Sequence, residues 1–237
     1  MSDHMICLLR KLFVLGFLGM TLSSGKNAES ALLPEVEAYA DLRVSEFSKI
    51  SDARKKQLEE LSVYVQKCVH EKKPAKLIFV CTHNSRRSHF SQIWAQVASR
   101  RFGLSGVECF SGGTEATAMN PRTIAALRRA GLQISLQQAS EDNPHYAVVF
   151  QDDGDPLVGF SKVVSSPVNP AAGFCAVMTC SQADKACPIV VGADSRIAIS
   201  YEDPKVSDGT LSEAAVYDQS CAEIAREMLY VMSLVRP

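Results

Sequence analysis

Two spacings of apolar residues divide the chain into two parts. Between residues 34 and 75, apolar positions recur three or four residues apart, which is typical of amphipathic helices. Pro34 suits the first turn of one helix, and Ser51 can cap the start of a second. The apolar positions of the second helix are Leu58, Leu61, Val65 and Cys68. We therefore expect residues 34–75 to form a helical extension that packs on the part of the chain that follows.

From residue 76 onward, short apolar runs alternate with helical patterns. The predicted strands are 77–80, 107–110, 146–150, 174–179 and one within 189–201. The predicted helices are 88–101, a helix that Asn120 caps and Gly131 closes, and 211–235. Strands that alternate with helices imply a parallel sheet with helices on both faces. Residues 76–237 are thus expected to form one α/β domain.

The amino-terminal segment has the layout of a secretory signal. Arg10 and Lys11 precede an apolar run over residues 12–22, and small residues follow at 23–25. The run is too short to span a bilayer comfortably, so no stable membrane insertion is expected. The alternative is an unstructured leader on a cytosolic protein. In both cases, residues 1–33 are interpreted as a leader or signal-like segment with a linker.

Composition narrows the class of protein. With 46% hydrophobic and 22% charged residues, the chain suits a folded globular protein. A formal net charge of -1 provides no field that would draw it to nucleic acid, so no nucleic-acid partner is expected. The eight cysteines include no Cys-x-x-Cys pair and do not form the dense set of a disulfide scaffold. Four of them are expected to be small buried residues: Cys68, Cys109, Cys175 and Cys221.

The segment 77–88 reads Leu-Ile-Phe-Val-Cys-Thr-His-Asn-Ser-Arg-Arg-Ser and joins a buried strand to a helix. Such a loop gathers backbone N–H groups around one point at a helix N-terminus, which suits a tetrahedral anion. Cys81 is the candidate nucleophile, Arg87 can hold two oxyanion oxygens, and Ser88 can donate to the sulfur. Asn84 suits a turn with positive φ. The alternative is a chance Cys and Arg, with Cys81 merely buried at a strand end. The residues expected to surround the oxyanion are Thr82, His83, Asn84, Ser85, Arg86, Arg87 and Ser88.

Further landmarks accompany this loop. They are Gly113-Thr114-Glu115, Asn120-Pro121, the stretch from Cys180 to Pro188, and Asp203-Pro204. With them, the chain from residue 76 resembles the low-molecular-weight protein tyrosine phosphatases and, more closely, their thioredoxin-coupled arsenate reductase branch. The resemblance implies a twisted four-stranded parallel sheet with helices on both faces, and a site at the carboxyl end of the first strand. It does not include the helical extension.

Cys180 and Cys187 favour the reductase branch, which carries two further cysteines at this spacing. The resemblance implies a relay in which Cys81 attacks arsenate, Cys180 displaces arsenite, and Cys187 forms a disulfide with Cys180. A thioredoxin-like partner would then reduce this disulfide. The alternative is a pair of structural cysteines on one helical face, because seven residues span about two helical turns.

Asp203 is the candidate general acid, because a leaving oxygen needs a proton. Asp155 also precedes a proline and is a rival, but only Asp203 follows the second cysteine pair, as the family pattern requires. Residues 205–207 contain no aromatic side chain that could stack on phosphotyrosine. This argues against an aryl phosphate as the substrate.

The loop departs from the family pattern at two positions. His83 replaces a usual glycine, and Arg86, where many members have cysteine, adds a second cation that either tightens anion binding or faces solvent. His89, on the first turn after the loop, is expected to pack or to face solvent. Gln92 stands where potassium-binding reductases often have an acidic residue, so neither a metal nor another cofactor is expected.

The sequence therefore predicts reduction of arsenate to arsenite. Two rivals stay open: a phosphatase that hydrolyses phosphate monoesters with Cys81, Arg87 and Asp203 alone, and a non-catalytic oxyanion sensor. A relay of reduced thiols favours the cytosol. The pattern over residues 1–25 favours export to the periplasm, which is the alternative to the cytoplasmic location that we predict.

Overall fold

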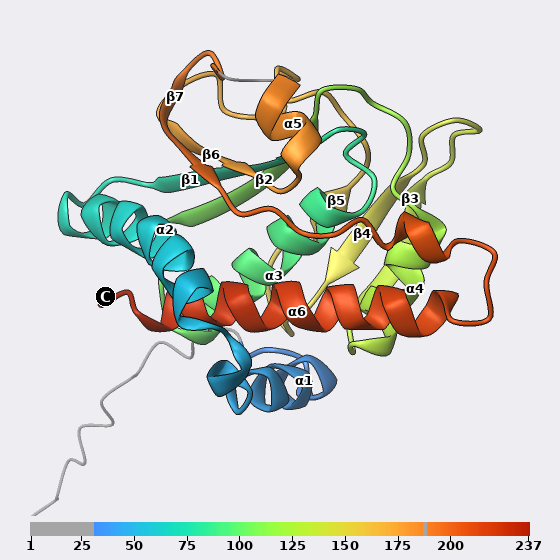
Figure 1. Ribbon diagram of the computed structural model, residues 1–237, viewed down its shortest axis with the longest axis horizontal. Coiled ribbons are helices and arrows are strands. Elements are labelled where there is room, and N and C mark those ends of the chain that lie inside the picture. The colour runs from blue at the N-terminus through green and yellow to red at the C-terminus, as the bar shows by residue number, and fades with distance from the viewer. Residues whose placement is uncertain (1–30, 187–188) are drawn as a thin grey trace, which may run out of the picture.

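The computed structural model describes residues 31–186 and 189–237 (Figure 1). The signal-like segment at residues 1–25 and Cys187 lie outside these ranges. The helices are α1 (Pro34–Val44), α2 (Asp52–His70), α3 (Arg87–Arg101), α4 (Pro121–Arg129), α5 (Ser181–Ala186) and α6 (Glu213–Ser233), with the short 3-10 helices η1 (Phe47–Lys49) and η2 (Pro204–Ser207). The strands are β1 (Ala75–Cys81), β2 (Val107–Gly113), β3 (Gln133–Gln138), β4 (His145–Val149), β5 (Leu157–Gly159), β6 (Phe174–Met178) and β7 (Ala193–Ala198).

A four-stranded parallel sheet with the order β2-β1-β6-β7 forms the centre of the fold. Strand β1 lies between two neighbours and is almost wholly buried, as its continuous apolar run predicts. Cys81 lies opposite Gly113 of β2, and Val80 lies opposite Met178 of β6. The parallel sheet predicted from the sequence is confirmed, and the carboxyl end of its strand β1 carries Cys81.

Helices lie on both faces of this sheet (Figure 1). Successive side chains of a strand point to opposite faces. Leu77 and Phe79 of β1 therefore belong to the core that contains α3 and α6, whereas Ile78 and Val80 pack in a second cluster with Ala183 of α5. Long helices cover the first face, and the short α5 with irregular segments covers the second.

The helices of the extension pack against α6 and share its hydrophobic core. Ser51 caps α2 as expected, because its side chain accepts a hydrogen bond from the backbone N–H of Arg54 at 3.3 Å. Leu58, Leu61 and Val65 of α2 are fully buried. The extension therefore completes the core of the α/β part of the chain.

A second, antiparallel sheet has the order β3-β4-β5. The sequence predicted β4 but neither β3 nor β5. In β3 only Ile134 is buried, so the strand lacks the apolar alternation by which a half-buried strand is found. The backbone N–H of Leu33 donates to the carbonyl oxygen of Phe150 at 3.0 Å, just after β4. This bond ties the second sheet to the start of the extension.

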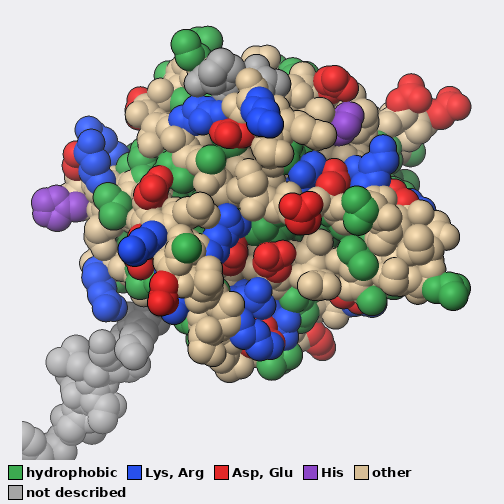
Figure 2. All heavy atoms as spheres, in the orientation of Figure 1, with side chains coloured by type: hydrophobic (Ala, Val, Ile, Leu, Met, Phe, Trp, Pro, Cys, Tyr) green, Lys and Arg blue, Asp and Glu red, His purple; other side chains and the backbone are tan. Residues whose placement is uncertain are grey.

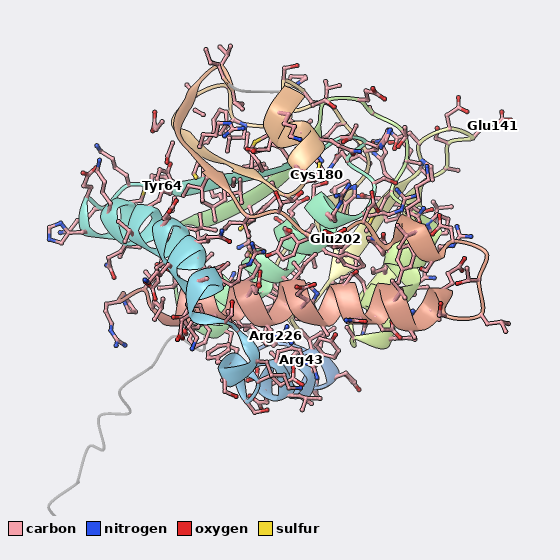
Figure 3. The ribbon with its side chains drawn as sticks, viewed as in Figure 1. Arg43, Tyr64, Glu141, Cys180, Glu202 and Arg226 are labelled. Atoms are coloured by element: carbon pink, nitrogen blue, oxygen red, sulfur yellow. The ribbon has the colours of Figure 1, made fainter. Side chains whose placement is uncertain are left out.

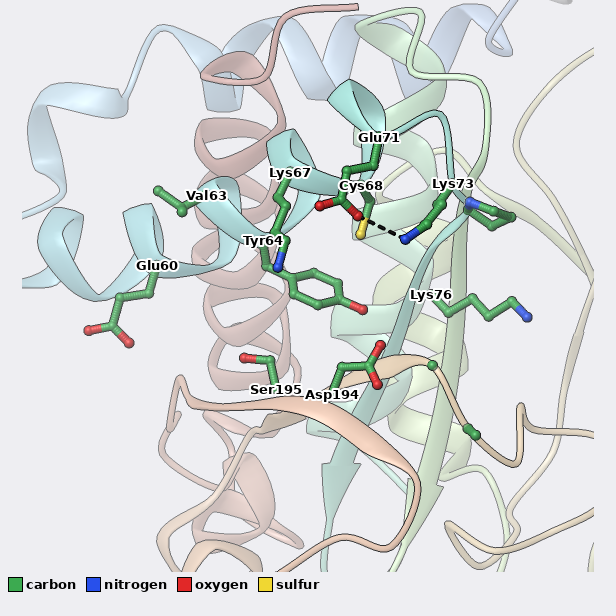
Figure 4. Close-up of a pocket in the computed structure, with 13 residues that line it drawn as sticks. Glu60, Val63, Tyr64, Lys67, Cys68, Glu71, Lys73, Lys76, Asp194 and Ser195 are labelled. Carbon is green, nitrogen blue, oxygen red and sulfur yellow. Dashed lines mark hydrogen bonds and ion pairs between the residues drawn. The ribbon is translucent and has the colours of Figure 1, made fainter.

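The surface is mixed in charge. On the face drawn in Figure 2, Lys and Arg side chains lie among Asp and Glu side chains. A cavity of about 610 Å³ lies between α2 and the first residues of β1 and β7, where Tyr64, Cys68 and Asp194 line it (Figure 4). It is at the opposite end of β1 from Cys81. No helix within residues 31–186 and 189–237 is long and apolar enough to cross a membrane.

We predict that Leu61→Ala lowers the free energy of unfolding by about 2–5 kcal/mol, because it opens a cavity in a fully buried site. Val63→Ala on the same helix is the control. Val63 is exposed, so its truncation should change this free energy by less than about 0.5 kcal/mol. Urea denaturation measures both variants. Two equally small effects would mean that α2 adds nothing to the core.

Candidate active site

A loop over residues 82–86 joins β1 to α3, and its carbonyl groups are held from outside. The carbonyl oxygens of Thr82, His83 and Ser85 accept hydrogen bonds of 2.8 to 3.2 Å from neighbouring segments. The donors are the backbone N–H groups of Glu115 and Asn120 and the hydroxyls of Thr114, Thr117 and Ser161. The segment 114–120 and Ser161 thus hold the outward-facing carbonyl groups of the loop in place.

These outward carbonyls determine where the amides of the loop point. In a planar trans peptide the N–H points away from the C=O, so the N–H groups of His83, Asn84 and Arg86 face the inside of the loop. Together with the N-terminus of α3, they form a cradle of partial positive charge that suits an oxyanion. Gly113 permits this packing, because a Cβ there would lie 2.7 Å from the carbonyl oxygen of Thr82.

Asn84 holds the turn of the loop. Its φ is 44°, in the left-handed region that Asn tolerates, as the sequence predicts. Its side-chain amide donates to Oγ of Ser88 at 2.9 Å. Its side-chain oxygen accepts from the backbone N–H of Lys162 at 2.9 Å. One residue thereby joins the loop to the first turn of α3 and to the segment after β5.

The sulfur of Cys81 lies 3.1 Å from Oγ of Ser88. A thiolate at Cys81 has no hydrogen to donate, so in that form its sulfur accepts the hydroxyl hydrogen of Ser88, whose oxygen accepts from Asn84. Such a hydrogen bond stabilises the negative charge that a sulfur carries when it acts as a nucleophile.

The guanidinium of Arg87 connects the loop to the segment before η2. Its Nη1 donates to the carbonyl oxygen of Tyr201 at 3.1 Å, and its Nη2 donates to Oδ2 of Asp203 at 2.7 Å. Its Nε is buried and has no hydrogen-bond partner among the residues that the structure describes. The Nε–Nη2 edge is therefore the edge that can bind two oxyanion oxygens, and Asp203 lies beside it.

The structure brings Asp203, and not Asp155, to this loop. The side chain of Asp203 also accepts a hydrogen bond from the backbone N–H of Lys205 at 3.1 Å, which caps η2. Asp155 is exposed in the turn before β5. Of these two residues, only Asp203 is in hydrogen-bond contact with Arg87.

Cys180 lies beside the loop, at the start of α5 (Figure 3). Strands β1 and β6 are neighbours, so the residues that follow them lie close together. The sulfur of Cys180 is 3.6 Å from Oγ1 of Thr82, the residue after Cys81. It also accepts a hydrogen bond from the backbone N–H of Ala183 at 3.3 Å, and it is fully buried. Cys187, the third cysteine of the predicted relay, lies outside the described residues.

Comparison with known proteins finds similarities in the α/β part of the chain. Residues 76–147 match the family described as low molecular weight phosphotyrosine protein phosphatase. An arsenate reductase of Brevibacillus brevis is 27% identical over 128 residues, which cover 54% of this chain and 75% of the relative. An arsenate reductase of Bacillus licheniformis is 27% identical over 143 residues, or 60% of this chain and 84% of the relative. The part of this chain from residue 76 is thus similar to the low-molecular-weight phosphatase family.

The low-molecular-weight phosphatase match begins after the helical extension. Both α1 and α2 precede residue 76, where the match starts. Among solved structures, a low molecular weight phosphotyrosine phosphatase from Vibrio cholerae is 12% identical with a TM-score of 0.46. The similarity covers 67% of this chain and 95% of that protein.

Arg86 has a position in this structure that its sequence did not reveal. Its Nε donates to the hydroxyl of Tyr217 at 2.9 Å, and its Nη2 lies 3.6 Å from Oδ2 of Asp208. These partners hold the side chain mostly buried, so it does not simply face solvent. Its effect on anion binding stays a prediction. Arg86 instead ties the loop to α6 and to the segment after η2. The side chain of His83 is partly exposed, with its Nε2 3.6 Å from the carboxylate of Glu115.

Burial keeps three further titratable side chains uncharged. His89 is fully buried, and burial together with the charge of Lys162 lowers its pKa to about 3, so its ring is neutral. Burial raises the pKa of Cys175 and of Cys221 to about 12, so both thiols stay protonated. In the described ranges, no group of three or more His, Cys, Asp or Glu side chains is placed to hold a metal ion.

Two residues that hold the site were missed by the sequence analysis. Tyr201 acts through its backbone carbonyl, which any residue possesses, so no residue pattern could have indicated it. Ser161 belongs to the segment 140–172, whose only visible property in the sequence is its irregularity. Its hydroxyl donates to the carbonyl oxygen of His83 at 2.9 Å and accepts from the backbone N–H of Thr117 at 2.8 Å.

We predict that Ser88→Ala slows alkylation of Cys81 by iodoacetamide at pH 7 about tenfold or more, because a hydrogen bond to a charged group contributes about 1.5–3 kcal/mol. Ser91→Ala on α3 is the control, since its hydroxyl donates to the carbonyl oxygen of Arg87. Mass spectrometry of the peptide that contains Cys81 gives both rates. Equal rates in the two variants would contradict the assigned role of Ser88.

Proposed function

We propose that this chain reduces arsenate to arsenite through a relay of three thiols, Cys81, Cys180 and Cys187. The observation that carries the proposal is the position of Cys180, whose sulfur lies 3.6 Å from Oγ1 of Thr82. Hydrolysis of a phosphate ester needs no second thiol beside the nucleophile, whereas a thiol relay needs one within reach. The similarity to proteins named arsenate reductase supports the same activity.

In the first step, the sulfur of Cys81 attacks the arsenic atom. The loop amides and Arg87 hold the arsenate oxygens. One oxygen accepts a proton from Asp203 and leaves as water, so that a bond between sulfur and As(V) is formed. The contact between Arg87 and Asp203 keeps this carboxyl group beside the bound oxyanion, and the carboxyl group must be protonated before it can donate.

In the second step, the sulfur of Cys180 attacks the sulfur of Cys81. The electron pair of the sulfur–arsenic bond passes to arsenic, which leaves as As(III) in arsenite, and a Cys81–Cys180 disulfide remains. Cys187 then attacks Cys180, which frees Cys81 and leaves a Cys180–Cys187 disulfide. A thioredoxin-like protein with two reduced thiols reduces that disulfide and completes the cycle.

Hydrolysis of phosphate monoesters is the second candidate, and it needs only the nucleophile, Arg87 and Asp203. The family match over residues 76–147 supports it, and phosphate has the same tetrahedral shape as arsenate. The segment after Asp203 disfavours aryl esters, because Lys205 and Val206 are exposed there and offer no aromatic ring to stack on the substrate.

The relay also implies a location. Its three thiols must be reduced at the start of every cycle, a condition that the cytosol meets and that exported proteins rarely meet. We therefore propose that the chain acts in the cytoplasm. Recovery of the native protein outside the cytoplasm, cleaved near residue 25, would contradict this location.

We predict that Cys180→Ser abolishes arsenite formation but leaves hydrolysis of a phosphate monoester unchanged, because only the relay needs the second thiol. Cys68→Ser is the control, since Cys68 lines the cavity at the other end of β1. Arsenite is measured with thioredoxin and its reductant present. Arsenite formation at the unaltered rate in the Cys180→Ser variant would exclude the relay.

We predict that Asp203→Asn lowers the rate of the chemical step by roughly 10²–10⁴-fold, the usual size of a general-acid effect. Asp155→Asn is the matched control and should leave the rate unchanged, because Asp155 is exposed in a distant turn. Single-turnover kinetics measure the step directly. If the Asp155 variant is the slow one, the acid has been assigned to the wrong segment.

A further inference from the structure

The extension reaches the segment that carries Asp203. Arg54 lies in the first turn of α2, and its Nε and Nη2 donate to the two carboxylate oxygens of Glu227 in α6, both at 2.9 Å. Its Nη2 also donates to the carbonyl oxygen of Ser200 at 3.2 Å. The guanidinium lies 4.9 Å from the centre of the Tyr201 ring, which adds a cation–π contact. Arg54 thus holds both backbone and side chain of the segment after β7.

Tyr201 in turn contacts the site on two sides. Its backbone N–H donates to the carbonyl oxygen of Thr179 at 3.1 Å, and Thr179 immediately precedes Cys180. Its carbonyl oxygen accepts from Nη1 of Arg87 at 3.1 Å, and Asp203 follows two residues later. The Tyr201 side chain is buried, so its ring position is fixed by packing as well as by Arg54.

The bond to Tyr201 determines how the guanidinium of Arg87 is oriented. Nη1 lies away from the Nε–Nη2 edge, and Nε is the buried nitrogen without a partner in the described part of the chain. With Nη1 anchored on the Tyr201 carbonyl, that edge stays directed at the oxyanion and at Asp203. A shift of Tyr201 would therefore disturb oxyanion binding and proton transfer together.

We propose that Arg54 is a positioning residue for the oxyanion site. It holds Tyr201 from the helical extension, and Tyr201 holds Arg87 and Asp203 in the geometry that binds and protonates the oxyanion. This inference rests on the oxyanion chemistry of the proposed function. Helix α2, which carries Arg54, lies before residue 76, where the family match begins. The helical extension thereby contributes to the oxyanion chemistry.

A test of this proposal must distinguish a loss of positioning at the oxyanion site from a loss of stability of the fold. The side chains of Arg54 and Glu227 are 19% and 4% exposed, so removal of one partner would leave a buried charge and destabilise the fold. The variant Arg54→Met/Glu227→Gln removes both charges together. The control is Arg129→Met/Asp218→Asn, which removes a more exposed ion pair, joined by three hydrogen bonds, between α4 and α6.

Two quantities are measured in the full chain, after circular dichroism has shown that each variant is folded. They are the dissociation constant of inorganic phosphate, by titration calorimetry, and kcat and KM for arsenate. The Arg54→Met/Glu227→Gln variant should raise the dissociation constant about tenfold and lower kcat about 10²-fold, the effect of a displacement of about 1 Å at a reacting group. The control pair should change neither quantity.

A second, independent readout is whether the effects of the Arg54 and Asp203 substitutions on kcat multiply. In the Asp203→Asn background, the Arg54→Met/Glu227→Gln changes should lower kcat less than in the wild type, because the part of their effect that acts through Asp203 is already absent and only the part through Arg87 remains. A merely structural role would leave the two effects multiplicative. Arg54→Lys keeps the charge that Glu227 needs but loses the two-bond contact, so it should show the same losses in smaller size even if the double variant fails to fold.

Unchanged phosphate affinity and turnover in folded Arg54 variants would overturn the proposal, and so would equal losses in the control pair. If the wild type binds phosphate but neither forms arsenite nor hydrolyses an ester, the proposed function fails. The phosphate affinity alone then still decides whether Arg54 positions the site.

Discussion

The site depends on the outward orientation of the carbonyl groups in the loop over residues 82–86. Because neighbouring segments bind these carbonyls, the adjacent N–H groups must point to a common centre. The left-handed backbone of Asn84 and the missing side chain of Gly113 make this packing possible. The cradle of N–H groups is therefore built into the backbone, and Cys81 and Arg87 lie at its two ends.

The side chains of two arginines that have no role in the proposed reaction steps hold the segment that carries Asp203. Arg54 contacts the start of the segment 200–208, through the Ser200 carbonyl and the Tyr201 ring. Arg86 contacts its end, through Asp208 and the hydroxyl of Tyr217. The hydroxyl of Tyr217 also donates to Asp208 at 2.8 Å. Asp203 thus lies between two fixed points, one supplied by the extension and one by the oxyanion loop itself.

The features that could be predicted from the sequence are the local ones. The buried strand β1, the loop after Cys81 and the caps at Ser51 and Asn120 each depend on residues within a few positions, and all four are found in the structure. The antiparallel sheet could not be predicted, because β3 exposes almost all of its side chains.

Contacts between residues that are far apart in the sequence could not be predicted for a different reason. Arg86 and Tyr217 are separated by 131 positions, and Arg54 and Glu227 by 173. Arg and Glu usually lie on the surface, so only the tertiary structure shows that Arg86 and Arg54 meet these partners. The same is true of the Tyr201 carbonyl, which carries no signal at all in the sequence.

In the proposed relay, Cys81 and Cys180 together give two electrons to one bound arsenate and become a disulfide. The most direct measurement uses the fully reduced Cys187→Ser variant, in which the relay must stop after its second step. After one equivalent of arsenate, peptide mapping by mass spectrometry should find a Cys81–Cys180 disulfide, together with one equivalent of arsenite. Two free thiols at these positions, or a disulfide that joins Cys81 to a different cysteine, would contradict the claim.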